Sequence, residues 1–219
     1  MARKPPVQQP PPVMRMLVKY GKVGPLKFAS HRDFARVLER GLRRAEIPMA
    51  YSSGFNPHQR ISYINPAPTG VGSVAEYCVV ALSEEVDPAD VQQRLQDAMP
   101  TDMPIYEVTE LVGQPCFEAS EFMARLDGID LLPLQQAVEA LLAKEEALVS
   151  RETKSGLRTF NARPAIESLT VTEPHTLRMV VRHTEPLVRA EDVCQALGLT
   201  LPHPPAVTRS RQGKLSDLL

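Results

Sequence analysis

The chain contains little cysteine, and its cysteines do not form a recognisable metal or cluster motif. Cys78, Cys116 and Cys194 are far apart in a sequence of 219 residues, and no C-x-x-C spacing occurs. This pattern excludes a zinc ribbon or an iron–sulfur motif in this chain and favours reduced, mostly buried thiols in a cytosolic protein. We therefore expect no metal site and no cofactor bound by the chain itself.

Long apolar segments are also missing. No run approaches the roughly 20 apolar residues of a membrane-spanning helix, and residues 1–13 are rich in proline but lack the apolar centre of a signal peptide. We expect a cytoplasmic protein without a membrane partner, in which residues 1–13 form a disordered tail. No Walker or dinucleotide fingerprint occurs, and Gly70-Val71-Gly72 is more typical of a tight hairpin connection than of a phosphate cradle.

The formal net charge of −1 conceals a separation of charge along the sequence. Ten lysines and arginines face three acids between Arg15 and Arg60, a balance of about +7, whereas nine acids face one arginine between Glu76 and Glu110, a balance of about −8. Such a separation creates a local positive field that the net charge does not show. RNA, although not DNA, is therefore kept as a possible partner.

The order of predicted elements indicates the fold class. In the first half, strands are expected at residues 14–20, 60–64, 76–82 and 105–111. Ser30 and Asp87 are favourable N-caps for two helices, the first of which ends at Pro48. The resulting βαββαβ order is that of the ferredoxin-like fold.

A similar order is expected after Gly113, although the two halves share no sequence repeat. Its expected strands are residues 122–127, 148–153, 157–160, 177–181 and 206–209, its helices are residues 133–144 and 190–197, with a turn at 154–156 and one helical turn at 164–169. We predict an α+β protein with two tandem ferredoxin-like modules, residues 14–113 and 114–219. A single α+β domain is the alternative.

The segment from Ser52 to Ser62, S-S-G-F-N-P-H-Q-R-I-S, combines turn-forming residues with polar side chains. Gly54 can adopt a positive φ, and Pro57 biases the preceding residue away from the helical region, so a shaped loop is expected here. Loops held by rigid elements often carry binding residues. The candidate substrate- or anion-binding side chains of this loop and the strand after it are those of Asn56, His58, Arg60 and Ser62.

We expect this loop to lie close to the N-terminus of the preceding helix. The unpaired N–H groups and partial positive charge of that helix end, together with Arg32 and Arg60, would then form an anion-binding corner. The alternative is that Asn56 and His58 only cap backbone groups.

The helix itself is strongly basic. Its candidate anion-binding residues lie opposite the apolar stripe and are Arg32, Arg36, Arg40, Arg43 and Arg44. Arginines at this spacing could track the phosphates of a nucleic acid. An ordinary solvated or partner-facing surface, with Glu39 paired to Arg43, explains the pattern equally well.

His31 and His58 are the candidate catalytic residues. Two histidines near arginines could perform general acid–base cleavage of RNA, and we expect their side chains to line one pocket, with a binding role more typical of such residues. A metal site is less favoured, because no nearby cysteine or carboxylate completes one.

Two motifs carry a family resemblance: S-H-R-D at residues 30–33 and G-F-N-P-H-Q-R-I-S at residues 54–62, within a similar stretch over residues 14–112. The sequence resembles the radical SAM-linked protein family, a bacterial domain of unknown function that is encoded beside a radical SAM gene or fused to the C-terminus of a radical SAM enzyme. T-K-S-G-L-R-T-F-N-A-R-P-A-I-E-S-L and P-A-V-T-R-S-R-Q-G extend the resemblance more loosely almost to the end.

The resemblance implies a cytoplasmic protein that works with a radical SAM partner, and it supplies no established activity. The partner would carry the iron–sulfur cluster and S-adenosylmethionine on a C-x-x-x-C-x-x-C motif, which this chain lacks. In related genomes such genes often lie near ribosomal-protein and ribonuclease genes, an association with RNA metabolism.

Three functions follow from these observations. The first is an accessory protein that binds RNA or presents a substrate to a radical SAM enzyme through the basic helix and the loop. The second is an RNA-processing or RNA-modifying enzyme that uses His31 and His58, since tandem ferredoxin-like folds occur in CRISPR RNA endonucleases and pseudouridine synthases. The third is a protein-interaction module without nucleic acid.

Overall fold

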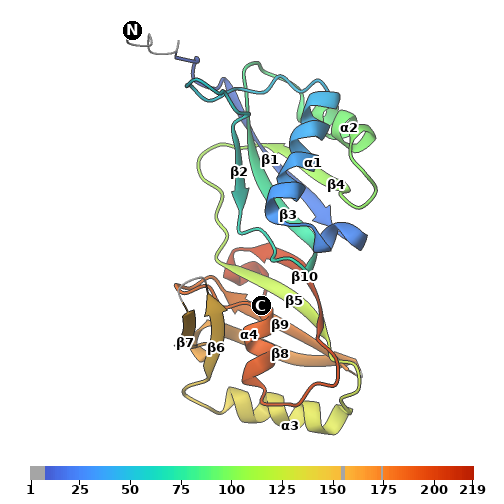
Figure 1. Cartoon of the computed structure of the whole chain (residues 1–219), viewed down its shortest axis with the longest axis vertical. Helices are drawn as coiled ribbons and strands as arrows, with labels where there is room; N and C mark the ends of the chain where they lie inside the picture. Colours follow the sequence, from blue (N-terminus) through green and yellow to red (C-terminus); the bar gives the residue numbers. More distant parts are fainter. Residues whose placement is uncertain (1–7, 154–155, 174) are drawn as a thin grey trace. The chain divides into compact units, whose positions relative to one another are not determined.

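The computed structural model describes residues 8–153, 156–173 and 175–219, which form an α+β structure with four α-helices and ten β-strands (Figure 1). The chain divides into two compact units, of which one ends at Pro115 and the other begins at Cys116. The boundary expected between residues 113 and 114 lies two residues earlier. Residues 1–7 of the expected tail and residues 154–155 of the expected turn lie outside the described part.

The first unit contains the six elements expected from its sequence. In chain order they are β1 (Met14–Lys22), α1 (His31–Arg44), β2 (Ile61–Ile64), β3 (Gly72–Leu82), α2 (Pro88–Ala98) and β4 (Ile105–Glu110). The strands lie in the order β4-β1-β3-β2, and all neighbours are antiparallel. The two strands joined by α1 are therefore separated by β3.

Helix α1 begins where its sequence predicts. The Ser30 hydroxyl accepts a hydrogen bond from the backbone N–H of Asp33 at 3.2 Å, which satisfies one of the unpaired donors of the first turn. Phe34, Leu38 and Leu42 form one buried stripe of the helix. Burial of each such side chain stabilises the fold by about 1.5–3 kcal/mol.

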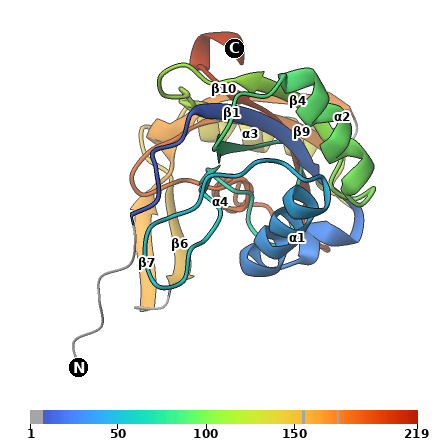
Figure 2. The ribbon, with the colours of Figure 1, turned by 90° about the horizontal axis from the view of Figure 1, so that it is seen from above.

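The sheet of the first unit has one face packed by helices. Met16, Val18 and Tyr20 of β1 are fully buried in the same core cluster as the α1 stripe, and Val91 of α2 joins them. Because side chains alternate along a strand, Arg15 and the other odd-numbered residues of β1 lie on the opposite face. In Figure 2, α1 lies on the concave side of the curved strand β1.

The connection between β2 and β3 is longer than the tight hairpin expected at Gly70-Val71-Gly72, because β2 ends at Ile64 and β3 begins at Gly72. The buried Lys22 ammonium donates to the carbonyl oxygens of Ala67 and Pro68, both at 3.0 Å. The Glu76 carboxylate accepts from the Ala67 N–H at 3.0 Å. These bonds fix the connection against the sheet.

Two residues of the expected tail contact the first unit. The Gln9 N–H donates to the Ser53 hydroxyl, and the Val13 N–H donates to the Leu82 carbonyl, each at 2.9 Å. The second of these bonds extends the pairing of β1 with β3 by one residue.

The described residues of the second unit form six strands and two α-helices. In chain order they are β5 (Ala119–Arg125), α3 (Leu131–Leu142), β6 (Leu148–Thr153), β7 (Gly156–Asn161), β8 (Ile166–Glu173), β9 (Thr176–Arg182), α4 (Ala190–Ala196) and β10 (Ala206–Gly213). Four of the strands lie in the antiparallel order β10-β5-β9-β8, and β6 pairs with β7 in a separate hairpin.

One expected element of this unit is wrong. The helical turn predicted at residues 164–169 is a short 3₁₀ turn at Arg163–Ala165 followed directly by β8. The hairpin β6–β7 is not part of the four-stranded arrangement and packs against α4. There the Arg151 guanidinium forms an ion pair with the buried Asp192 at 2.8 Å.

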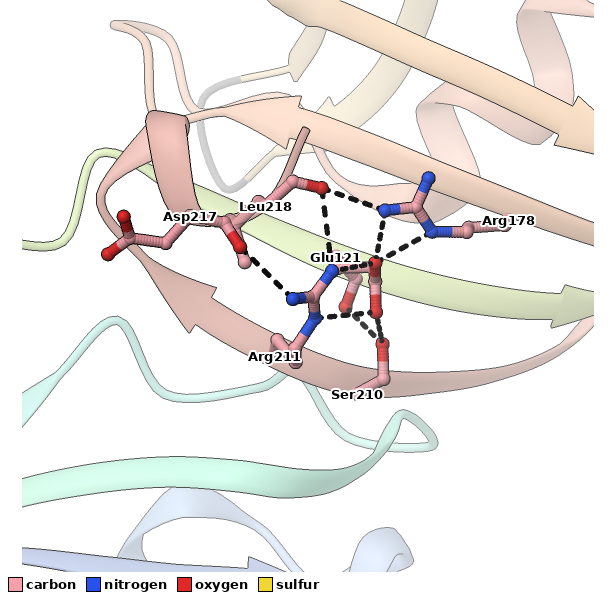
Figure 3. A network of polar contacts seen from close by, with 6 residues as sticks. All are labelled: Glu121, Arg178, Ser210, Arg211, Asp217 and Leu218. Carbon is pink, nitrogen blue, oxygen red and sulfur yellow. Dashed lines mark hydrogen bonds and ion pairs between the residues drawn. The ribbon is translucent and has the colours of Figure 1, made fainter.

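A polar network holds the last turn of the chain to the sheet of the second unit (Figure 3). Glu121 of β5, which is 6% exposed, accepts hydrogen bonds from Arg178 of β9 and from Arg211 and Ser210 of β10. Both arginines also donate to the carbonyl of Leu218. This arrangement lowers the pKa of Glu121 to about 2, chiefly because Arg211 hydrogen-bonds to its charged form.

Candidate anion-binding surfaces

All five arginines predicted to bind anions on α1 are exposed, on the side of the helix away from its buried stripe; we call them the α1 arginine face: Arg32, Arg36, Arg40, Arg43 and Arg44. Two of them are paired to acids of the same helix, Arg36 to Asp33 at 3.3 Å and Arg43 to Glu39 at 3.7 Å. The alternative noted from the sequence, a Glu39–Arg43 pair, is therefore present. Arg32 and Arg44 form no ion pair with the residues that the structure describes.

These ion pairs leave the α1 arginine face available to a ligand. An exposed ion pair contributes only about 0.2–1 kcal/mol to the stability of the fold. A phosphate can therefore replace the carboxylate of Asp33 or Glu39 at little cost in free energy. From Arg32 to Arg44 the helix rises about 18 Å. A surface of that length can contact several successive phosphates of an extended strand.

The predicted loop is closed by its own backbone and by one side chain. The Ser52 N–H donates to the His58 carbonyl at 2.8 Å, and the Ser52 hydroxyl accepts from the His58 N–H at 3.0 Å. Gly54 has a φ of +135°, as its sequence position predicts. Asn56 and His58 are exposed at the tip, so their side chains are accessible to a partner.

The position of this loop corrects the sequence analysis. Arg60 pairs with both Ala50 and Ala81, through Arg60 N–H to Ala50 O at 2.9 Å and Ala81 N–H to Arg60 O at 3.0 Å. The loop therefore lies beside the last residues of β3, the end of the sheet at which α1 finishes. The prediction that it lies near the N-terminus of α1 is wrong, because Met49 and Ala50, which follow the C-terminus of α1, pair with Leu82 and Ala81 at this end of the sheet.

The two candidate catalytic histidines come from different elements, His31 from the first turn of α1 and His58 from the loop before β2. The His31 ring contacts the edge of Tyr63 on the helix side of the sheet, with ring centroids 4.9 Å apart. His58 lies in the loop, five residues before Tyr63 in the sequence. That the two imidazoles line one pocket and act together on one phosphate therefore stays a prediction.

Arg60 and Ser62 lie on the face of the sheet that carries no helix. Ile61 and Tyr63 pack against the helix-side core, so the alternate residues of β2 face the other way. There they line a cavity of about 330 Å³, which we call the sheet-face cavity, together with Arg15 of β1. The predicted anion-binding corner of Arg60 with the α1 N-terminus is therefore not formed.

Arg15 is the residue that sequence reasoning missed at this surface. The signal was present, because Arg15 lies between the core residue Met16 and Met14, which packs against the core, in a strand that the sequence predicts. Its Nη2 donates to the carbonyl of Gly113 at 2.7 Å, which fixes one end of the guanidinium and leaves its other donors for a ligand.

Sequence reasoning also missed a polar pair inside the second unit, formed by Ser120 and His183. The Ser120 hydroxyl lies 2.8 Å from His183 Nε2, and His183 Nδ1 lies 2.9 Å from the Phe117 carbonyl oxygen. Since only a protonated Nδ1 can donate to that carbonyl, Nε2 accepts from Ser120. Burial lowers the pKa of His183. Ser120 is only 1% exposed, so the pair resembles a nucleophile and base but cannot meet a substrate.

A family model described as "Uncharacterized protein conserved in bacteria (DUF2344)" matches residues 15–190. The chain belongs to this family. The α1 arginine face and the loop both lie inside the matched part of this DUF2344 protein. No curated protein matches the sequence.

A solved structure, "Crystal Structure of a Cbf5-Nop10-Gar1 Complex", matches with a TM-score of 0.43 and 13% identity, covering 90% of this chain and 48% of the other. The DUF2344 protein therefore spans about half the length of that chain. At these values the similarity carries no argument about function.

Two further observations bear on cofactors and membranes. Over residues 8–153, 156–173 and 175–219 of this DUF2344 protein, no three histidine, cysteine or acidic side chains gather into a group that could hold a metal ion. In the same residues, none of the helices has the length and apolar character needed to cross a bilayer.

Proposed function

We propose that the protein is a non-radical accessory subunit of a radical SAM enzyme, and that it binds RNA through the α1 arginine face and the neighbouring loop. The observation that carries this proposal is the presence of five exposed guanidinium groups on one face of α1, against only two acids that pair with them. Guanidinium groups bind phosphate oxygens in pairs, and several on one rigid element fix the register of a strand.

The loop supports the same proposal. It exposes Phe55, which is 62% accessible, beside His58 and Asn56. Exposed rings stack on unpaired bases, a contact worth about 1–3 kcal/mol per base. Because the loop lies at the end of the sheet at which α1 finishes, a strand that tracks the helix would continue toward the loop.

The proposed division of labour rests on the resemblance to radical SAM-linked proteins. The partner would carry the iron–sulfur cluster and S-adenosylmethionine, and this chain, which lacks the cysteine motif for the cluster, would carry neither cofactor. Substrate held on the α1 arginine face would then be presented to the partner.

We also infer that each unit is a ferredoxin-like module. The sheets of the two units have equivalent orders, β4-β1-β3-β2 and β10-β5-β9-β8, with antiparallel neighbours throughout. In the second unit, the hairpin β6–β7 would be an insertion between α3 and β8. The equivalence supports the tandem architecture expected from the order of elements.

One observation favours a protein-interaction module as a second candidate. Leu148 and Leu157 are 67% and 71% exposed on the β6–β7 hairpin. A partner that covered this hairpin would bury both side chains, and each would contribute about 1.5–3 kcal/mol to binding. This surface and the α1 arginine face lie in different units, so the two functions are compatible.

Co-purification from a native host tests the proposed function. The tagged full chain is isolated with and without nuclease treatment, and bound protein and nucleic acid are identified separately. We expect a radical SAM protein in both samples and RNA only in the untreated one. A partner that is present only before nuclease treatment would mean that RNA alone links the two proteins, and absence of both would contradict the proposal.

A further inference from the structure

Two arginines flank one alanine on the face of the first sheet that carries no helix. Arg15 of β1 is the direct partner of Ala81 of β3. On the other side, the Ala81 N–H donates to the Arg60 carbonyl at 3.0 Å, one residue before the Ile61–Val80 pair of β2 and β3. The three residues therefore form one row across the sheet, with the smallest side chain in the middle.

The spacing of this row suits one anion. Neighbouring strands lie about 4.8 Å apart, so the Cα atoms of Arg15 and Arg60 are about 10 Å apart. Both side chains line the sheet-face cavity, and Ala81 leaves the space between them unfilled. Two guanidinium groups that approach from opposite sides can each bind two oxygens of the same tetrahedral group.

The charges of the sheet-face cavity are of one sign. Its lining contains two arginines and no acid: Pro12, Arg15, Arg60, Ser62, Ile64, Val79, Ala81, Gln114 and Pro115. A cavity of similar volume, about 320 Å³, holds Arg44 and Arg94 but also Glu46 and Asp97, so its charges balance internally. The sheet-face cavity has no such internal compensation.

The donors in the sheet-face cavity are available. The Arg60 side chain forms no ion pair or hydrogen bond with the described residues, and Ser62 beside it is exposed. Arg15 uses one donor on the Gly113 carbonyl. The apolar walls, formed by Ile64 and Val79, could contact the sugar or base attached to a phosphate.

We propose that the sheet-face cavity binds a phosphate monoester, carried by the end of an RNA strand or by a free nucleotide. Arg15 and Arg60 hold the phosphate oxygens, and the Ser62 hydroxyl donates to the third. The dianion is the preferred ligand, because two positive groups face it and a phosphate monoester loses its second proton near pH 6. The idea that the phosphate belongs to an RNA strand rests on the proposed function. The affinity of the cavity for a phosphate monoester does not depend on it.

Calorimetric titration of the full chain tests this site with three probes: inorganic phosphate, a nucleoside monophosphate, and one oligoribonucleotide with either a 5′-phosphate or a 5′-hydroxyl. We expect the monophosphate to bind, and Arg60→Ala to weaken its binding at least tenfold. Arg158→Ala, which removes an exposed arginine of the second unit, should change nothing. Ser62→Asp places a negative charge beside Arg60 and should weaken binding even more.

The oligonucleotides separate this site from the proposed function. A 5′-phosphate should strengthen RNA binding in the wild type and not in Arg60→Ala, whereas affinity common to both oligonucleotides belongs to the α1 arginine face. Binding of the monophosphate without any RNA binding would support the cavity and contradict the proposed function. Equal affinities for both oligonucleotides, with no binding of inorganic phosphate or monophosphate, would overturn the cavity and leave the proposed function intact.

Discussion

Arg211 holds the carboxylate of Glu121 with two nitrogen atoms, Nη2 at 2.7 Å from Oε2 and Nε at 3.2 Å from Oε1 (Figure 3). Arg178 binds the same Oε2 from the neighbouring strand β9, with Nε at 2.7 Å. The carboxylate is thus shared by strands on both sides of β5. Such bidentate, charge-assisted bonds are about twice as strong as neutral ones.

Glu121→Gln should destabilise the protein by about 3 kcal/mol, because the change leaves two arginines beside a neutral amide in a largely buried site. Urea unfolding measures the difference. Glu152→Gln, at an exposed position of β6, is the matched control and should stay within about 0.5 kcal/mol of the wild type. A loss below 1 kcal/mol for Glu121→Gln would show that the network contributes little to stability.

The contact between Glu121 and Arg211 also predicts that the fold loses stability at low pH. The folded-state pKa of Glu121 is lowered from 4.5 to about 2, so the unfolded state takes up the proton first. The contribution of the Glu121 carboxylate to folding stability is complete above pH 4.5 and is lost as the pH falls from 4.5 toward 2. The difference in stability between wild type and Glu121→Gln should shrink across that window; a constant difference would contradict the assignment.

The buried His183 predicts a second dependence of folding stability on pH, closer to neutral pH. Burial lowers its pKa, with Arg209 acting in the same direction, so the unfolded state binds the proton more readily. The contribution of His183 is therefore present above its ordinary value of 6.5 and is lost as the pH falls toward the lowered value.

His183→Gln should remove that slope of stability against pH. The exposed His203 provides the control, since His203→Gln should leave the slope unchanged. Thermal unfolding at half-unit steps from pH 5 to pH 7.5 measures both variants. Parallel curves for His183→Gln and wild type would show that another group titrates in this range.

The α1 arginine face predicts a salt-dependent affinity for RNA. Replacing Arg36, Arg40 and Arg44 by glutamate should abolish retention of a single-stranded RNA at low salt, since each lost phosphate contact removes about 0.7 from the slope of log K against log salt. The change should leave the helical circular dichroism signal intact, because none of the three side chains is buried.

A second triple variant controls for overall charge. Arg125, Lys144 and Arg158 are exposed in the second unit, and their replacement by glutamate changes the net charge equally. RNA retention should survive in this variant. If both variants lose RNA to the same extent, binding follows net charge and not the α1 arginine face.

The elements of the first unit could be predicted because their signals are local. Ser30 and Asp87 cap their helices as expected, and the apolar stripe of α1 is the one read from the sequence. Strand β8 was missed because its alternation is broken. A register shift between Ile166 and Ser168 places Ile166 and Leu169 three residues apart on the buried side, which has the spacing of a helical turn.

The site was harder to predict, since it depends on which face each residue meets. Arg60 was assigned to the helix side, whereas the alternation of β2 places it on the opposite face beside Arg15, a partner 45 residues earlier in the sequence. His31 and His58 are both exposed, as binding residues would be, but they come from different elements, and only His31 contacts β2, through Tyr63. The alternation of each strand is visible in the sequence, but the pairing that brings Arg15 and Arg60 to either side of β3 is not.

Strand β1 serves two surfaces with a single stretch of nine residues. Met16 and Val18 supply the core, and Arg15 supplies the sheet-face cavity. Inserting or deleting one residue in β1 would exchange the two faces, placing an arginine in the core and methionines on the surface. An insertion at the tip of the loop, by contrast, would leave both faces of β1 in register and would change only the contacts of the loop itself.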